Sequence, residues 1–310
     1  MAEKAPIRIT DIGVFLPETR LSLEGFQETS AEFLREKTGF SSVARKGAEQ
    51  ATSDLACAAM EALFQRDERL RERIELLIVV TQNPDGVGLP HTSAIVHGRL
   101  SLPKNIAAFD VSLGCSGWVY AVDVAAAFLD RNNMNCGVVV TADPYSAVLD
   151  ENDRNTMLLF GDAAAATVLE RQGPGWIPDP ALFGTDGTRH ADLEVDIDGK
   201  LQMKGRAIFE FSAIEVPKLI GNLLESKNLK VEQVDRFLLH QASRFVVETI
   251  GRRIDASDRT PFIDNGIGNT VSSTLPMLLA GGICDDDSLV VTCGFGVGLS
   301  WAGTVMRRVD

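Results

Sequence analysis

The sequence predicts an α/β protein made of two similar halves, each a mostly parallel sheet with helices on both faces. Short apolar runs rich in Val, Ile and Leu alternate with stretches of helical periodicity, which is the pattern of a sheet buried on both faces. The same order of elements occurs twice, with intervals of similar length. A Pro- and Gly-rich stretch over residues 172–180 separates the copies. We therefore place the first half at residues 1–172 and the second at 173–310.

In the first half, the apolar runs are short enough for strands and the amphipathic stretches are long enough for helices. Val138, Val139 and Val140 are β-branched, as buried strands favour. The predicted order is a helix over 53–64, a strand over 76–81, a strand over 106–109 that leads into a turn at Cys115, a helix over 119–129 and a strand over 138–141.

The second half repeats this order. The predicted elements are a helix over 213–226, a strand over 237–240, a strand over 261–264 that leads into a turn at Asn269, a further helix and a strand over 289–292. If the halves pack about a pseudo-two-fold axis, the equivalent turns meet near it. Cys115 then faces Asn269, and His240 at its strand end joins them, where α/β proteins place their sites.

Composition and charge exclude several classes of protein. The chain has 310 residues, 45% of them hydrophobic, which is enough for a sizeable core. A net charge of −13 disfavours nucleic acid and anionic membranes as partners. The N-terminal residues contain no apolar signal stretch, and apolar segments are interrupted by Asp123 or Asp162 before they reach the length of a membrane span. We expect a cytoplasmic protein.

No metal or other cofactor is expected. The five cysteines are widely spaced and form no CxxC pair, which argues against a disulfide framework or a zinc site. His91 and His97 have no nearby thiolate or carboxylate pair. The glycine run 294–298 precedes a stretch that is typical of a strand, whereas a dinucleotide-binding glycine loop opens a helix.

Cys115 is the candidate nucleophile. It lies between Gly114 and Gly117, after a predicted strand and before a predicted helix. Backbone N–H groups and the helix dipole at such a position favour a thiolate. The alternative is a simply packed thiol, as most buried cysteines are. That alternative suits the other four cysteines, which have no comparable turn: Cys57, Cys136, Cys284 and Cys293.

His240 and Asn269 also have two interpretations. His240 ends an apolar strand and could be a structural histidine with satisfied hydrogen bonds. Asn269 could serve turn formation, but Asn265 and Gly266 can supply the positive φ angles, which leaves the Asn269 side chain to donate hydrogen bonds. Their repeat-related positions opposite Cys115 favour catalysis for both.

Several ordered motifs resemble a known family. The sequences around Cys115, His240 and Asn269 are similar to those of the Cys-His-Asn condensing enzymes of the thiolase superfamily, in particular β-ketoacyl-[acyl-carrier-protein] synthase III. This resemblance covers essentially the whole chain and implies a thiolase-like fold, in which two duplicated helix–sheet–helix halves form a five-layered αβαβα core. The further matching segments are 37–40, 153–156, 160–165 and 295–301.

The resemblance implies roles for these residues. Cys115 would take an acyl group from a thioester, and His240 with Asn269 would bind the malonyl thioester carbonyl during decarboxylation. Developing oxyanions need preorganised donors, which the backbone N–H groups of Cys115 and Val297 could supply. No cofactor is implied beyond the thioester substrates.

The resemblance also implies binding residues. Phe33, which replaces the usual Trp, and Arg154 would stack on the adenine of CoA, and Lys37 would belong to the same CoA and pantetheine site. The residues implied in docking an acidic carrier protein are Arg244, Arg252 and Arg253. An arginine of the family is replaced here by Phe245, and the segment 184–206 is short for the family. These departures leave the acyl donor and the chain length open.

The leading hypothesis is condensation of an acyl-CoA or acyl-carrier protein with malonyl-carrier protein, in fatty acid or secondary-metabolite synthesis. Two alternatives stay open: acyl transfer to an oxygen or nitrogen nucleophile, and a non-catalytic partner subunit, which would not need the intact triad. We also expect a homodimer, because the resemblance implies that strand 138–141 pairs across a two-fold axis and a lone chain would expose that edge.

Overall fold

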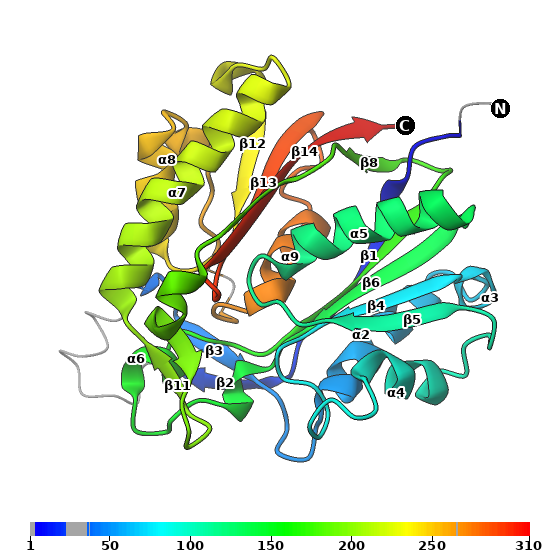
Figure 1. Ribbon diagram of the computed structural model, residues 1–310, viewed down its shortest axis with the longest axis horizontal. Helices are drawn as coiled ribbons and strands as arrows, with labels where there is room; N and C mark the ends of the chain where they lie inside the picture. Colours follow the sequence, from blue (N-terminus) through cyan, green and yellow to red (C-terminus); the bar gives the residue numbers. More distant parts are fainter. Residues whose placement is uncertain (1–3, 23–35, 37, 265) are drawn as a thin grey trace.

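The computed structural model describes residues 4–22, 36, 38–264 and 266–310. Within them, ten strands form one mixed sheet in the order β12-β13-β14-β8-β1-β7-β6-β4-β5, with β9 beside β14 (Figure 1). The first-half strands are β1 (Arg8–Phe15), β4 (Leu76–Val80), β5 (Ala107–Val111), β6 (Cys136–Ala142) and β7 (Ala164–Glu170). The second-half strands are β8 (Gly175–Pro178), β9 (Leu182–Thr185), β12 (Arg236–Leu239), β13 (Leu289–Gly296) and β14 (Ser300–Val309).

The two halves repeat one strand order. β7 runs antiparallel between β1 and β6, and β6 is parallel to β4. In the same way β14 runs antiparallel between β8 and β13, and β13 is parallel to β12. The halves join where β1 pairs with β8 at a single register position, Ile9 opposite Trp176. In the first half β5 extends the sheet by one more parallel strand.

Helices form three layers around the two parts of the sheet (Figure 1). One core cluster packs the middle helices against strands of both halves, and separate clusters lie beneath each outer pair. The prediction of a five-layered thiolase-like fold is confirmed. The middle layer is α5 (Gly117–Asn132) and α9 (Thr274–Ala280), and the outer layers are α2 (Thr52–Phe64) with α4 (Thr92–Arg99) and α7 (Gly205–Ser226) with α8 (Arg244–Arg253).

The structure also contains shorter elements outside these layers (Figure 1). They are the helices α3 (Leu70–Arg73) and α6 (Arg154–Met157), the hairpin strands β2 (Thr19–Ser22), β3 (Ser42–Arg45), β10 (Leu193–Val195) and β11 (Leu201–Met203), and the 3-10 turns η2 (Tyr145–Ala147), η3 (Gly187–Asp192), η4 (Val231–Gln233), η5 (Ser257–Arg259) and η6 (Val271–Ser273). None of the helices in this described part combines the length and the apolar character needed to cross a membrane.

The prediction of a strand at 261–264 is wrong, because these residues form an irregular segment. Pro261 has no N–H to give to a ladder. The side chain of Gln241 takes the place of a neighbouring strand: its Nε2 donates to the Pro261 carbonyl at 3.3 Å, and its Oε1 accepts from the Ile263 N–H at 2.9 Å. The second half therefore has no counterpart of β5 at this position.

The strand predicted to lie at the edge of the sheet is central. β6 pairs with β4 on one side and with β7 on the other, and every one of its residues is buried. The edge strand of the first half is β5, which pairs with β4 and is half-buried along its length. Whether a strand lies at the edge or in the centre of a sheet depends on pairing between distant segments, which an apolar pattern does not reveal.

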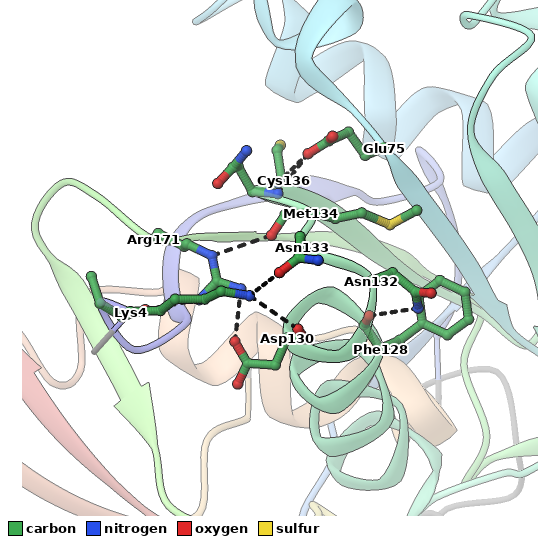
Figure 2. A network of polar contacts seen from close by, with 11 residues as sticks. Lys4, Glu75, Phe128, Asp130, Asn132, Asn133, Met134, Cys136 and Arg171 are labelled. Atoms are coloured by element: carbon green, nitrogen blue, oxygen red, sulfur yellow. Dashed lines mark hydrogen bonds and ion pairs between the residues drawn. The ribbon is translucent and has the colours of Figure 1, made fainter. Parts of the chain in front are cut away.

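A polar network fixes the C-terminal end of α5 (Figure 2). The helix is capped by Asn133, which has a left-handed φ of 58°. Arg171 donates to the Met134 carbonyl at 3.2 Å and to the Asp130 carboxylate at 2.7 Å, and Lys4 contacts the Asn133 side chain. Because the opposite end of α5 follows Cys115, this network holds the helix that positions the candidate nucleophile.

Arg171→Ala should lower the free energy of unfolding by about 2 kcal/mol, because three hydrogen bonds from a side chain that is only 11% exposed are lost. The third of these runs from Nη1 to the Ala5 carbonyl at 2.9 Å. Urea denaturation at one fixed protein concentration measures the change. Arg131→Ala is the control, since Arg131 is exposed on the same end of α5. Equal stability of the two variants would contradict this account of the network.

Candidate active site

Cys115 lies in the turn between β5 and α5, two residues before the helix begins. The Gly117 N–H donates to the Gly114 carbonyl at 2.8 Å and closes the turn. The flanking glycines are needed for space, because a Cβ at Gly114 would lie 2.7 Å from the Val297 side chain and a Cβ at Gly117 would lie 2.5 Å from Val80. The Cys115 side chain is buried between the two halves.

The resting form of Cys115 is a neutral thiol. Burial, together with the nearby Asp143 carboxylate, raises the pKa of Cys115 to about 12. Hydrogen bonds from the backbone of Cys115 and Val297 lower the pKa, but burial outweighs them. The expectation of a thiolate from the helix N-terminus is therefore wrong for the free protein, because loss of water around the sulfur outweighs the backbone donors that favour the thiolate.

Two backbone donors converge on the sulfur. One belongs to Cys115 itself and the other to Val297, in the connection between β13 and β14. Gly296, at the end of β13, makes this approach possible, because a Cβ there would lie 2.7 Å from the Cys115 Sγ. The glycine run thus connects two strands and carries a donor to the sulfur.

His240 follows the last residue of β12. Its N–H donates to the Cys293 carbonyl at 2.9 Å, and its ring packs edge-on against Phe295 at 5.5 Å between ring centroids. Burial lowers the pKa of His240 to about 3, and a backbone hydrogen bond with Val271 raises it only in part. The imidazole is therefore neutral at physiological pH, so one ring nitrogen can accept a proton while the other donates.

Asn269 is held by backbone and side chain. Its N–H donates to the Leu159 carbonyl at 2.9 Å, and its carbonyl accepts from the Gly161 N–H at 2.8 Å. Its Oδ1 accepts from the Val271 N–H at 2.9 Å, which orients the amide and leaves the NH₂ group to donate. Val271 adopts a φ of 52°, a strained conformation for a β-branched residue.

One cavity of about 700 Å³ brings Cys115, His240 and Asn269 together. Aromatic and aliphatic side chains form most of its surface, among them Leu193, Met203, Phe209 and Phe245. A buried thiol, a neutral imidazole and an oriented amide can together attack a carbonyl, move a proton and stabilise an oxyanion.

The residues expected to bind CoA are placed only in part. Phe33 and Lys37 lie outside the described residues. Arg154 is the first residue of α6, and the adjacent Asn155 lines the cavity. Arg206, at the start of α7, also lines the cavity, with its side chain 91% exposed. Sequence reasoning missed Arg206, because the segment before it was considered only for its length.

The arginines expected to dock a carrier protein lie on or beside α8. Arg244 donates to the Gly39 carbonyl at 3.3 Å and packs over the Phe262 ring. Arg252 is exposed and lies 3.9 Å from the Glu248 carboxylate. Arg253 donates to the Ala213 carbonyl and so joins α8 to α7. Their neighbour Phe245 is half-exposed and lines the cavity.

Behind Cys115 lie three polar residues that sequence reasoning also missed: Gln82, Asp143 and Tyr145. Gln82 follows β4 and Asp143 follows β6. Both therefore occupy carboxyl ends of parallel strands, the same rule that singled out His240. Applied to every strand, this rule could have found them.

Gly296→Ala should slow alkylation of Cys115 by iodoacetamide at least about tenfold, because the new methyl group overlaps the sulfur. Mass spectrometry of the modified peptide measures the rate. Gly98→Ala in α4 is the matched control, since no heavy atom lies within 4 Å of its added Cβ. A variant at Gly296 that reacts as fast as the control would disprove the close approach.

Comparison with known proteins agrees with this geometry. Sequence profiles described as 3-oxoacyl-[acyl-carrier-protein] synthase III and its C-terminal part match residues 109–187 and 224–308. The chain is 31% identical to β-ketoacyl-[acyl-carrier-protein] synthase III of Lactococcus lactis subsp. lactis (strain IL1403), covering 97% of this chain and 98% of that protein. It is 33% identical to the same enzyme of Streptococcus suis (strain 05ZYH33), with the same coverage.

Solved structures give the same result. A 2.1 Å crystal structure of 3-oxoacyl-(acyl-carrier-protein) synthase III matches with a TM-score of 0.91 at 31% identity, covering 97% of this chain and 99% of that one. The Thermus thermophilus enzyme matches with a TM-score of 0.87 at 29% identity, covering 97% and 98%. The chain therefore belongs to the 3-oxoacyl-[acyl-carrier-protein] synthase III family of condensing acyltransferases.

Proposed function

We propose that this enzyme condenses an acyl thioester, carried by CoA or a carrier protein, with malonyl-carrier protein by decarboxylative Claisen chemistry, in fatty acid or secondary-metabolite biosynthesis. The observation that supports this most strongly is the convergence of Cys115, His240 and Asn269 on one mostly apolar cavity. The names of the relatives, which are acyl-carrier-protein synthases, support the same substrates.

In the first step the Cys115 sulfur attacks the thioester carbonyl. Its proton passes to the neutral His240 imidazole and then to the departing thiol, so the carbon–sulfur bond to the donor breaks as the bond to Cys115 forms. The oxyanion forms between the N–H groups of Cys115 and Val297, the groups that hydrogen-bond the sulfur at rest.

In the second step the malonyl group loses CO₂ and leaves an enolate. The Asn269 NH₂ group donates to the enolate oxygen, and so does His240 in the tautomer that carries its N–H on the nitrogen facing the cavity. The carbanion attacks the acyl-enzyme carbonyl, the new carbon–carbon bond forms, and the bond to Cys115 breaks. The sulfur then regains a proton from water.

The entrance to the cavity suits an acidic protein that carries its acyl group on a long arm. Arg252 and Arg206 are exposed, and Arg206 together with Phe245 lines the cavity. We include Arg244 and Arg253 in this docking surface because they belong to the same helix as Arg252, α8. Arg154, next to the cavity-lining Asn155, supports contact with a CoA nucleotide.

The repeated strand order supports a division into two duplicated units, which we propose to be residues 1–172 and 173–310. Each unit contributes to the site: Cys115 comes from the first, and His240 and Asn269 come from the second.

Asn269→Ala should abolish carbon–carbon bond formation while leaving acylation of Cys115 largely intact. Loss of one oxyanion donor costs about 10²–10³ in rate, and only the malonyl step uses this donor. Intact-mass spectrometry measures acylation, and product analysis with malonyl-carrier protein measures condensation. Cys115→Ala should lose both activities, and Asn222→Ala, exposed on α7, should lose neither.

The same experiment separates the competing functions. Full turnover of Asn269→Ala would favour acyl transfer to an oxygen or nitrogen nucleophile, which needs no enolate donor. Acylation that persists in Cys115→Ala would disprove the proposed nucleophile. Absence of acylation in the wild-type protein across acyl-CoA and acyl-carrier-protein donors would favour a non-catalytic partner subunit.

We also propose that two copies pair through the edge strand β5. An apolar surface extends from β5 across α5: the Phe109 and Phe128 rings lie 5.8 Å apart, and Tyr120 lies 4.5 Å from Phe183. Tyr120, Val124 and Phe128 recur every four residues on one helix face. An identical strand in a second copy would complete the open edge of the sheet (Figure 1).

A loop beside this surface exposes further apolar side chains. Val87 and Leu89 are 92% and 87% exposed, an uncommon state for such residues in a monomer. The end of the loop is tied to β5, since the Asp110 carboxylate accepts from the N–H groups of Thr92 and Ser93. The loop and the edge strand therefore form one surface for the same partner.

Analytical ultracentrifugation should detect a dimer of the 33.5 kDa chain at micromolar concentration. Val124→Arg should dissociate it, because the proposed symmetry brings each new charge into an apolar interface. Ile214→Arg on the outer helix α7 is the matched control, since Ile214 is also exposed. A wild-type monomer, or a dimer that withstands Val124→Arg, would contradict this interface.

A further inference from the structure

A cluster of two buried side chains and one half-buried side chain supports the turn of the proposed nucleophile from behind. This support cluster consists of Gln82, Asp143 and Tyr145. A Cβ built on Gly114 would lie 2.6 Å from the Gln82 Oε1 and 3.3 Å from the Tyr145 hydroxyl. The Tyr145 hydroxyl also donates to the Gln82 Oε1 at 3.0 Å. Gln82 and Tyr145 therefore pack directly against the residue that precedes Cys115.

Asp143 holds the other side of this cluster. It is 1% exposed, and its Oδ1 accepts from the Gln82 N–H at 3.1 Å and from the Asn83 side chain at 2.8 Å. Its Oδ2 is also buried and has no hydrogen-bond partner within the described residues. A carboxyl group with an unpaired buried oxygen is costly, which calls for an explanation beyond packing.

The negative charge of Asp143 affects the Cys115 thiol electrostatically. Burial raises the pKa of Asp143 to about 6, so the group is mostly ionised at neutral pH. Its charge raises the pKa of Cys115 and of Tyr145, the titratable groups near it. The polar residues beside the carboxylate, Thr81, Gln82 and Asn83, are uncharged.

We propose that Asp143 is a positioning residue of this enzyme: it holds Gln82, and through Gln82 the Tyr145 side chain, against the Gly114–Cys115 turn, and its carboxylate adds to the effect of burial that keeps the resting thiol protonated. This inference rests on the proposed role of Cys115 as the acylated residue. A protonated thiol resists alkylation and oxidation, because the thiolate is the reactive form. Attack on a bound thioester still proceeds, because His240 accepts the proton as the bond forms.

Asp143→Asn tests the role of the charge. The variant keeps the size of the side chain and the acceptor oxygen, but it removes the negative charge. Alkylation of Cys115 by iodoacetamide between pH 7 and 9 should become about tenfold faster at each pH, because the thiolate fraction rises. Asp123→Asn on α5, a half-buried carboxylate that accepts from the Ala181 N–H at 3.1 Å, should react as the wild type does.

Gln82→Ala tests the positioning role without changing a charge. Acylation by acetyl-CoA needs Cys115 aligned with its backbone donors, whereas alkylation does not. Acylation should therefore fall about tenfold relative to alkylation, the order of effect expected from weakening one oxyanion donor. A purely structural cluster would change both rates together or neither, and this variant decides the point even if Asp143→Asn does not fold.

Two outcomes would overturn the proposal. One is equal alkylation of Asp143→Asn and the wild type at every pH. The other is an unchanged ratio of acylation to alkylation in Gln82→Ala. If acetyl-CoA and an acyl-carrier protein both fail to acylate the wild-type protein, the proposed function fails instead, and the alkylation comparison still decides the role of the Asp143 charge.

Discussion

The site depends on the burial of Cys115 between the two halves. Removal of water raises the pKa of the thiol to about 12 and lowers the pKa of His240 to about 3, so the pair is uncharged. A neutral pair has no charge to stabilise an intermediate, and the cavity must therefore supply fixed donors. The backbone of Cys115 and Val297 and the Asn269 amide are such donors, and they cost no reorganisation when charge develops.

These donors are aligned because both halves contribute to them. The Ser116 hydroxyl, next to the nucleophile, hydrogen-bonds the Ser300 hydroxyl of the second half at 2.9 Å instead of capping its own helix. Asn269 is clamped by the backbone of Leu159 and Gly161 from the first half. A Cβ at Gly161 would lie 1.7 Å from the Ile267 carbonyl oxygen, so the clamp requires glycine there. The internal duplication therefore places the candidate catalytic side chains where the two halves meet.

Local sequence patterns predicted most of the helices and strands, because their periodicities are visible in the sequence without any knowledge of tertiary contacts. The turn at Cys115 was predictable for the same reason. Features set by distant contacts were not. The 261–264 segment is irregular because the Gln241 side chain pairs with it, and β6 is central because β7 pairs with its second edge. The thiolate prediction failed because a helix N-terminus is visible in sequence, whereas the burial of the sulfur is not.

Val271 adopts a strained backbone conformation that orients the Asn269 amide. A β-branched residue with positive φ costs about 1–3 kcal/mol and persists only when its surroundings impose it. In this conformation its N–H donates to the Asn269 Oδ1, and the Asn269 NH₂ group is left as the donor. Aspartate would present a second acceptor in place of the NH₂ group, which would repel an enolate oxygen. The strained backbone thus selects both the amide and its orientation, before any substrate arrives.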